Sequence, residues 1–232
     1  MLKLIALVLF AALVGCAKFP SSGSSDFTKR LLFTMTVDSQ LRTGGEPGGS
    51  GFPYVYIVAI RLSTDPNPTD TGPIPVVVPG GNGFVAGNCT HFILWNPLAS
   101  PSYQIFQFED STLNDWFQTG VPIQFLPIEV GDDTLSFEID LSQLVAVALV
   151  PTIQSIQVNF LTMNNTNTSG GGRLWDALGN GNIPAEINSY FTFQPNFAAL
   201  YTNSTTGNVE PPGDVSDPDL DIVDWSIEVR LP

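Results

Sequence analysis

The sequence predicts an all-β protein, an antiparallel β-sandwich of about ten strands with one or two short helices. Three observations support this prediction. Short runs of alternating apolar and polar residues recur from residue 28 onward, turns rich in Gly and Pro separate them at intervals of about ten residues, and few stretches have helical spacing. We therefore expect a single sandwich domain over residues 28–232, a length that one such domain can reach.

The first and last predicted strands alternate most clearly. Leu31–Val37 and Val223–Leu231 both place apolar side chains at odd positions and mostly polar ones between them. Residues 135–141 alternate in the same way, so we expect Ser136, Glu138 and Asp140 to face water. Residues 54–62 are apolar on both faces apart from Arg61, which is typical of a strand inside a sheet. The remaining predicted strands are 76–78 at a sheet edge between two prolines, 84–95, 103–108, 123–130 and 153–163.

One segment follows the helical period instead. Asp140 and Gln143 form the pattern of an N-cap and its capping-box partner, and Pro151 ends the apolar spacing, so a helix of about two turns is expected between them. A single helical turn is expected over Arg173–Gly179 and another short helix over Pro184–Tyr190. Residues 203–221 are expected to form a long acidic loop.

The first fifteen residues have the layout of a signal peptide. Lys3 precedes an apolar run over residues 4–14 that is too short to cross a bilayer of about 30 Å. Leu13, Val14, Gly15 and Cys16 follow the lipobox pattern, and this leader resembles those of bacterial lipoproteins. The resemblance implies cleavage after residue 15, lipidation of Cys16 and a flexible tether over residues 16–27 that is rich in Ser and Gly. An ordinary cleaved signal with a chance cysteine is the alternative.

Localisation follows from the same resemblance. The protein is expected to be exported and lipid-anchored to the bacterial cell envelope, with its domain facing the periplasm or the cell exterior. Ala17, rather than Asp, follows the cysteine, which by family analogy favours the outer membrane if the source is diderm.

Composition limits the expected partners. The formal net charge is −14, with 22 acidic and 8 basic residues, so the surface repels nucleic acid and anionic headgroups, and membrane attachment must come from the lipid. The chain has two cysteines, and lipidation of Cys16 leaves Cys89 without an intrachain disulfide partner. A surface glycan or an envelope protein is the expected partner.

A second resemblance covers about 45 residues. A strand ending in Phe137 to Asp140, the segment Leu141–Leu144, a further strand and a loop holding Trp175 and Asp176 together resemble the second half of sandwich domains related to family 9 carbohydrate-binding modules and their DOMON-like relatives. That resemblance implies binding of a sugar or a cofactor rather than catalysis.

The acidic loop is a candidate calcium site. Asp214, Asp217, Asp219 and Asp221 could supply the hard oxygen ligands that Ca²⁺ prefers, and a cation would relieve their mutual repulsion. An EF-hand is not expected, because Ile222 stands where its loop needs Gly and Glu228 lies in a predicted strand rather than at the start of a helix. The alternative is a solvated acidic loop without an ion. No other cofactor is expected.

Aromatic residues in or beside loops are candidates for a ligand platform, above all Trp116, Trp175 and Tyr190, because a flat ring can stack on a sugar face. The alternative is that these rings fill the core. Cys89 and His91 could share a strand face, but we interpret them as a buried thiol beside an ordinary histidine. Residues 81–86 match a dinucleotide fingerprint only superficially, because a strand rather than a helix is expected to follow.

The sequence thus predicts a lipid-anchored envelope protein with a structural, adhesive or binding role and no catalytic residues. A carbohydrate-binding lipoprotein is the main alternative. A glycoside hydrolase is a third, because 22 acidic residues could include the required pair of carboxylates.

Overall fold

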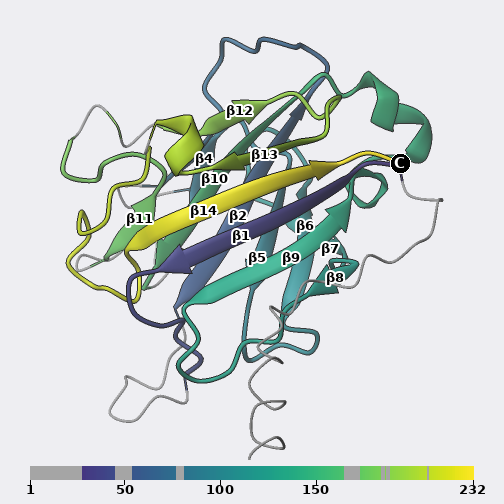
Figure 1. Cartoon of the computed structure of the whole chain (residues 1–232). Coiled ribbons are helices and arrows are strands. Elements are labelled where there is room, and N and C mark those ends of the chain that lie inside the picture. Colours follow the sequence, from purple (N-terminus) through teal and green to yellow (C-terminus); the bar gives the residue numbers. More distant parts are fainter. Residues whose placement is uncertain are drawn as a thin grey trace, which may run out of the picture.

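Two antiparallel β-sheets pack face to face in the computed structural model of the chain (Figure 1). The structure describes residues 28–44, 54–76, 81–164, 173–183, 186, 189–207 and 209–232. The predicted leader and tether, including Cys16, lie outside these residues. The predicted antiparallel all-β sandwich is confirmed.

The strand orders of the two sheets follow from their pairings. The five-stranded sheet has the order β13 (Ala199–Thr202), β14 (Ile222–Arg230), β1 (Arg30–Val37), β9 (Thr134–Asp140) and β8 (Gln124–Phe125). The seven-stranded sheet has the order β11 (Trp175–Ala177), β10 (Ser155–Met163), β2 (Val55–Ser63), β5 (His91–Trp95), β6 (Tyr103–Phe108) and β7 (Trp116–Gly120), and β12 (Phe191–Phe193) also pairs with β10. A separate hairpin joins β3 (Pro73–Pro75) to β4 (Val85–Gly87).

The main core lies between the two sheets, as the alternation predicts. Phe33 of β1 is fully buried, and its ring lies 5.4 Å from that of Phe137 on β9 and 6.4 Å from that of Phe160 on β10 of the opposite sheet. Trp225 of β14 packs against Phe160 from the other side, at 5.6 Å. The C-terminal strand therefore pairs inside a sheet, between β13 and β1, as expected.

The outer face of the seven-stranded sheet carries a second apolar cluster, here called the outer cluster. The hairpin region around β3 and β4 contributes to it, as do strands β2, β5 and β10. Its buried members are Ile57, Ala59, Phe84, Val85, Cys89, Phe92, Phe108, Leu113, Leu161, Met163 and Ala177. This second cluster explains why β2 is apolar on both faces apart from Arg61.

The expectation that one face of β9 is wet is wrong. Glu138 is only 1% exposed, because the guanidinium groups of Arg30 on the adjacent β1 and Arg230 on β14, one strand further, lie at 3.4 Å and 2.9 Å from its carboxylate. Ser136 is covered as well and shares a hydrogen bond with Thr34 at 3.2 Å. The stems of long basic side chains can thus cover a polar strand face while the charged groups pair with its acids.

The predicted two-turn helix is instead two 3-10 helices, η1 (Leu141–Gln143) and η2 (Val147–Thr152). The capping box is confirmed: Ser142 N donates to Asp140 Oδ1 at 2.9 Å, and Asp140 N donates to Gln143 Oε1 at 3.1 Å. Ala146 breaks the helix with an extended backbone (ψ 140°). A third 3-10 helix, η3 (Ser204–Thr206), lies in the predicted acidic loop.

Several other boundaries differ from the prediction. The helical turn expected over residues 173–179 is wrong, because Trp175–Ala177 forms β11 and pairs with β10. The expected strand 84–95 is split into β4 and β5 at Gly87, whose φ of +73° favours glycine. Only Gln124–Phe125 of the expected strand 123–130 is paired. The expected strand 76–78 lies mostly outside the described residues, as does much of the expected helix 184–190.

Candidate functional site

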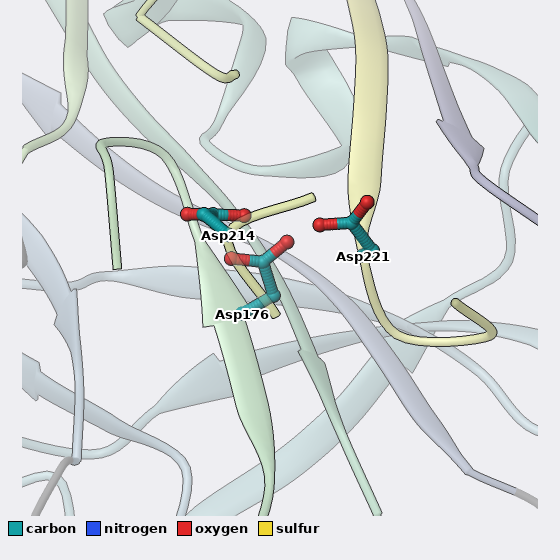
Figure 2. A group of neighbouring side chains, drawn as sticks. All are labelled: Asp176, Asp214 and Asp221. Carbon is teal, nitrogen blue, oxygen red and sulfur yellow. The ribbon is translucent and has the colours of Figure 1, made fainter. Parts of the chain in front are cut away.

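The structure brings three carboxylates together where β11 of the seven-stranded sheet approaches the start of β14 of the five-stranded sheet. Figure 2 shows Asp176 of β11, Asp214 of the long loop and Asp221 just before β14 pointing toward one another. One oxygen from each lies within 4.8 Å of the others. We call these three residues the acidic cluster.

Polar side chains of β10 position this cluster. Thr162 stands opposite Asp176 in the strand register, and its hydroxyl donates to the carbonyl of Leu220 at 2.5 Å. Asn159 accepts a hydrogen bond from the backbone N–H of Leu178 at 3.0 Å. Both β11 and the segment leading into β14 are therefore fixed to the same strand, β10.

Backbone N–H groups hold each carboxylate in place. Asp176 accepts from Ile222 N at 2.7 Å, a bond that crosses from the seven-stranded to the five-stranded sheet. Asp221 accepts from Gly213 N at 2.7 Å, and Asp214 accepts from Gly181 N at 2.6 Å. Asp214 Oδ1 is buried and has no hydrogen-bond partner among the described residues.

Glu210 adds a fourth carboxyl group. Its side chain is fully buried, and Oε2 accepts from Gly179 N at 3.1 Å, whereas Oε1 has no hydrogen-bond partner in the described part of the chain. The pKa of Glu210 is raised to about 12, chiefly by burial and in smaller part by the charges of Asp176, Asp214 and Asp221. The four carboxyl groups therefore act on one another electrostatically.

Burial also raises the pKa of Asp176 well above its usual value, with the charge of Asp214 as the next cause. The pKa of Asp214 is raised to about 6, first by burial and then by Asp221. The described arginines at positions 30, 42, 61 and 230 form ion pairs with acids outside the cluster, and Arg173 donates to the Gly83 carbonyl and the Met163 sulfur. These ion pairs of the described residues therefore do not offset the cost of burying the carboxylates of the cluster.

The four predicted calcium ligands have two different environments. Asp214 and Asp221 lie in the acidic cluster. Asp219 forms an ion pair with Arg42, and Asp217 accepts hydrogen bonds from the Tyr54 hydroxyl at 2.7 Å and from the Asp219 backbone at 3.1 Å. The structure therefore does not bring all four together.

Sequence reasoning missed Asp176 and Glu210 as members of this site. The sequence places Asp176 beside Trp175 in an expected loop. Its hydrogen bond from Ile222 N joins residues 46 positions apart in the sequence. No local pattern marks such a pairing.

A groove on the outer face of the seven-stranded sheet is the second candidate site. Its volume is about 370 Å³, and its apolar floor includes Phe92 and Phe106, whose rings stack at 4.8 Å. Its lining residues are Tyr54, Val55, Ile57, Asn82, Phe84, Phe92, Leu94, Trp95, Asn96, Leu98, Phe106 and Trp116. The volume is at the lower end of the usual range for small-molecule sites, roughly 300 to 1,000 Å³.

The three predicted platform aromatics do not share this groove. Trp116 of β7 lines it and is 38% exposed, although it lies on an edge strand rather than in a loop. Trp175 is partly buried against the outer cluster. Tyr190 lies over Gly72, and its hydroxyl donates to the carbonyl of Asp70 at 3.4 Å.

Cys89 and His91 have structural environments. The Cys89 thiol is buried, with the carbonyls of Ile60 and His91 at 3.4 Å and 3.2 Å, and burial raises its pKa to about 12. Burial lowers the pKa of His91 to about 4. Residues 81–86 form a turn, in which Asn82 accepts from the N–H groups of Phe84 and Val85, and then lead into β4 rather than a helix.

Comparison of the chain with protein-family models, with curated proteins and with solved structures found no match in any of the three. None of the helices in the described part of the chain has both the length and the apolar character needed to span a bilayer.

Proposed function

We propose that the protein is a cell-envelope lipoprotein, lipidated at Cys16, whose β-sandwich binds a ligand at the cell surface through the outer groove. The observation that carries the binding role is the groove itself, with Trp116 partly exposed at its wall. The lipid anchor is supported by the leader sequence, residues 1–16. An outer-membrane location is part of the proposal if the source is diderm.

The chemistry of the groove favours a ligand with flat apolar faces and polar edges, such as a sugar residue of a surface glycan. Phe106 and Trp116 offer aromatic faces and edges, and Asn96 supplies an amide in the same lining. Sites for small ligands commonly combine a mostly apolar lining with a few polar groups that orient the ligand. This composition also agrees with the carbohydrate-binding alternative expected from the sequence.

A binding role is favoured over hydrolysis by the same lining. A glycoside hydrolase needs two carboxylates on either side of the scissile bond, roughly 5 to 10 Å apart. Among the described residues, those that line the groove include no Asp or Glu. We therefore assign no catalytic residue.

A structural or adhesive role is the second candidate, and exposed apolar side chains favour it. Leu98 at the groove is 74% exposed, and Phe117, the neighbour of Trp116, is 48% exposed. A protein partner that covered these side chains would remove them from water.

Glycan pull-down with the purified full chain in detergent tests the proposal. The wild type should retain a surface glycan, and Trp116→Ala should bind it at least ten-fold more weakly, because a central aromatic contact is commonly worth more than about 1.4 kcal/mol. Phe197→Ala is the matched control, since Phe197 is exposed, lies outside the groove lining and precedes β13 of the other sheet. Glycan binding that Trp116→Ala leaves unchanged would refute the groove assignment. Copurification with a large envelope assembly, without glycan retention, would support the structural role instead.

A further inference from the structure

The acidic cluster has features that a solvated acidic loop lacks. Asp176 is only 1% exposed, and Glu210 is fully buried with one carboxylate oxygen unpartnered among the described residues. Asp214 Oδ1 is a second buried oxygen without a partner. Buried polar atoms are nearly always satisfied by a protein group, water or an ion. The carboxyl groups of Glu210 and Asp214 accept from Gly179 N and Gly181 N, two residues apart in one segment, so a ligand bound beside this segment is a candidate partner for both oxygens.

A positively charged ligand fits this site, because three carboxylates meet there. The ion pairs of Arg30, Arg42, Arg61 and Arg230 go to other acids, and the described hydrogen bonds of Arg173 go to the Gly83 carbonyl and the Met163 sulfur. Backbone N–H groups already donate to Asp176, Asp214 and Asp221, but each carboxylate oxygen keeps a second lone pair that can bind a metal ion.

We propose that Asp176, Asp214 and Asp221, with Glu210 as the fourth carboxyl group, form a Ca²⁺ site that links the two sheets of the sandwich. The donors are all carboxylate oxygens, the ligand type that Ca²⁺ prefers, with no His or Cys among them. Asp176 belongs to the seven-stranded sheet, Asp221 leads into the five-stranded sheet, and Asp214 lies in the connecting loop. One ion would therefore join three segments that the sequence separates.

The ligand type favours Ca²⁺ over Mg²⁺. Ca²⁺ takes six to eight oxygen ligands in flexible geometry, whereas Mg²⁺ dehydrates reluctantly and usually keeps several waters, with only one or two protein carboxylates. Three aspartate oxygens that lie within 4.8 Å of one another, held in a largely buried site, therefore suit Ca²⁺ better.

Calorimetric titration with CaCl₂ and thermal unfolding of the detergent-purified full chain, with and without EGTA, test the site. Calcium at about one hundred times its Kd should raise the unfolding midpoint by roughly 5 to 10 °C. Asp176→Asn and Glu210→Gln should abolish this shift. If either variant fails to fold, Asp214→Asn gives the same test, because Asp214 is only half-buried and lies in a loop.

Asp217→Asn is the matched control. Asp217 lies in the same loop but bonds to Tyr54 outside the cluster, so this variant should keep the wild-type calcium response. No heat of binding and no change in midpoint for the wild type would overturn the proposal. So would a response to Mg²⁺ equal to that to Ca²⁺, or a calcium shift that Asp217→Asn removes and Asp176→Asn retains.

Discussion

Replacing Phe33 with Ala should destabilise the sandwich strongly, because this ring joins the two sheets at the centre of the main core. Phe33 is fully buried, and its ring contacts Phe137 in its own sheet and Phe160 in the opposite sheet. Truncation of a buried Phe to Ala costs about 3 to 5 kcal/mol through lost transfer free energy and the cavity left behind. For a domain of this size, that loss lowers the melting temperature by roughly 6 to 20 °C.

The neighbouring position supplies the control. Leu32 lies on the opposite face of β1 and is half-buried, beside Glu138 and Glu228 in the strand register. Leu32→Ala should cost about 1 kcal/mol or less, because it leaves no closed cavity. Urea unfolding followed by tryptophan fluorescence measures both variants. Equal costs for Phe33→Ala and Leu32→Ala would refute the assignment of inner and outer faces.

Three further predictions concern buried polar groups. Glu138→Gln should lower the free energy of unfolding, measured by urea titration, by about 1 to 2 kcal/mol, because the partly exposed Arg30 and Arg230 lose their shared buried carboxylate. An unchanged free energy of unfolding would mean that these ion pairs do not stabilise the fold. Because His91 has a pKa of about 4 when folded and about 6.5 when unfolded, only the unfolded chain takes up its proton between these values, and stability falls as the pH drops. The difference in free energy of unfolding between wild type and His91→Gln should therefore change by up to about 2 kcal/mol between pH 7.5 and pH 5. A difference that does not change with pH would contradict the burial of His91. The buried Cys89 thiol, with its pKa raised to about 12, should react with a thiol reagent at pH 8 only after denaturation, whereas rapid labelling of the native protein would show that it is accessible.

The strands with strict alternation could be predicted from the sequence. Leu31, Phe33, Met35 and Val37 are all buried, as the period of two requires. The capping box of Asp140 could also be predicted from the sequence, because Asp140 and Gln143 lie only three residues apart. Local patterns sufficed wherever the deciding contact was local.

Contacts distant in sequence account for the failures. Residues 173–179 lack a long alternating run, and only the pairing of β11 with β10 makes them a strand. Glu138 looked exposed because nothing in its own strand shows that Arg30 and Arg230 cover it.

The acidic loop illustrates the same limit. Four aspartates at alternate or nearby positions predicted a common ligand set. Arg42 and Tyr54 instead bind Asp219 and Asp217, whereas β11 brings Asp176 to the other two. The residue types of a carboxylate site could be predicted, but its membership depends on how the sheets meet.

Mass spectrometry of the protein isolated from its source cells tests the central claim, anchorage of an exported sandwich in the cell envelope, most directly. We expect a membrane-bound chain that begins at Cys16 and carries acyl groups, and Cys16→Ser should release the protein from the membrane fraction. An unmodified protein in the soluble fraction that still begins at Met1 would contradict the account.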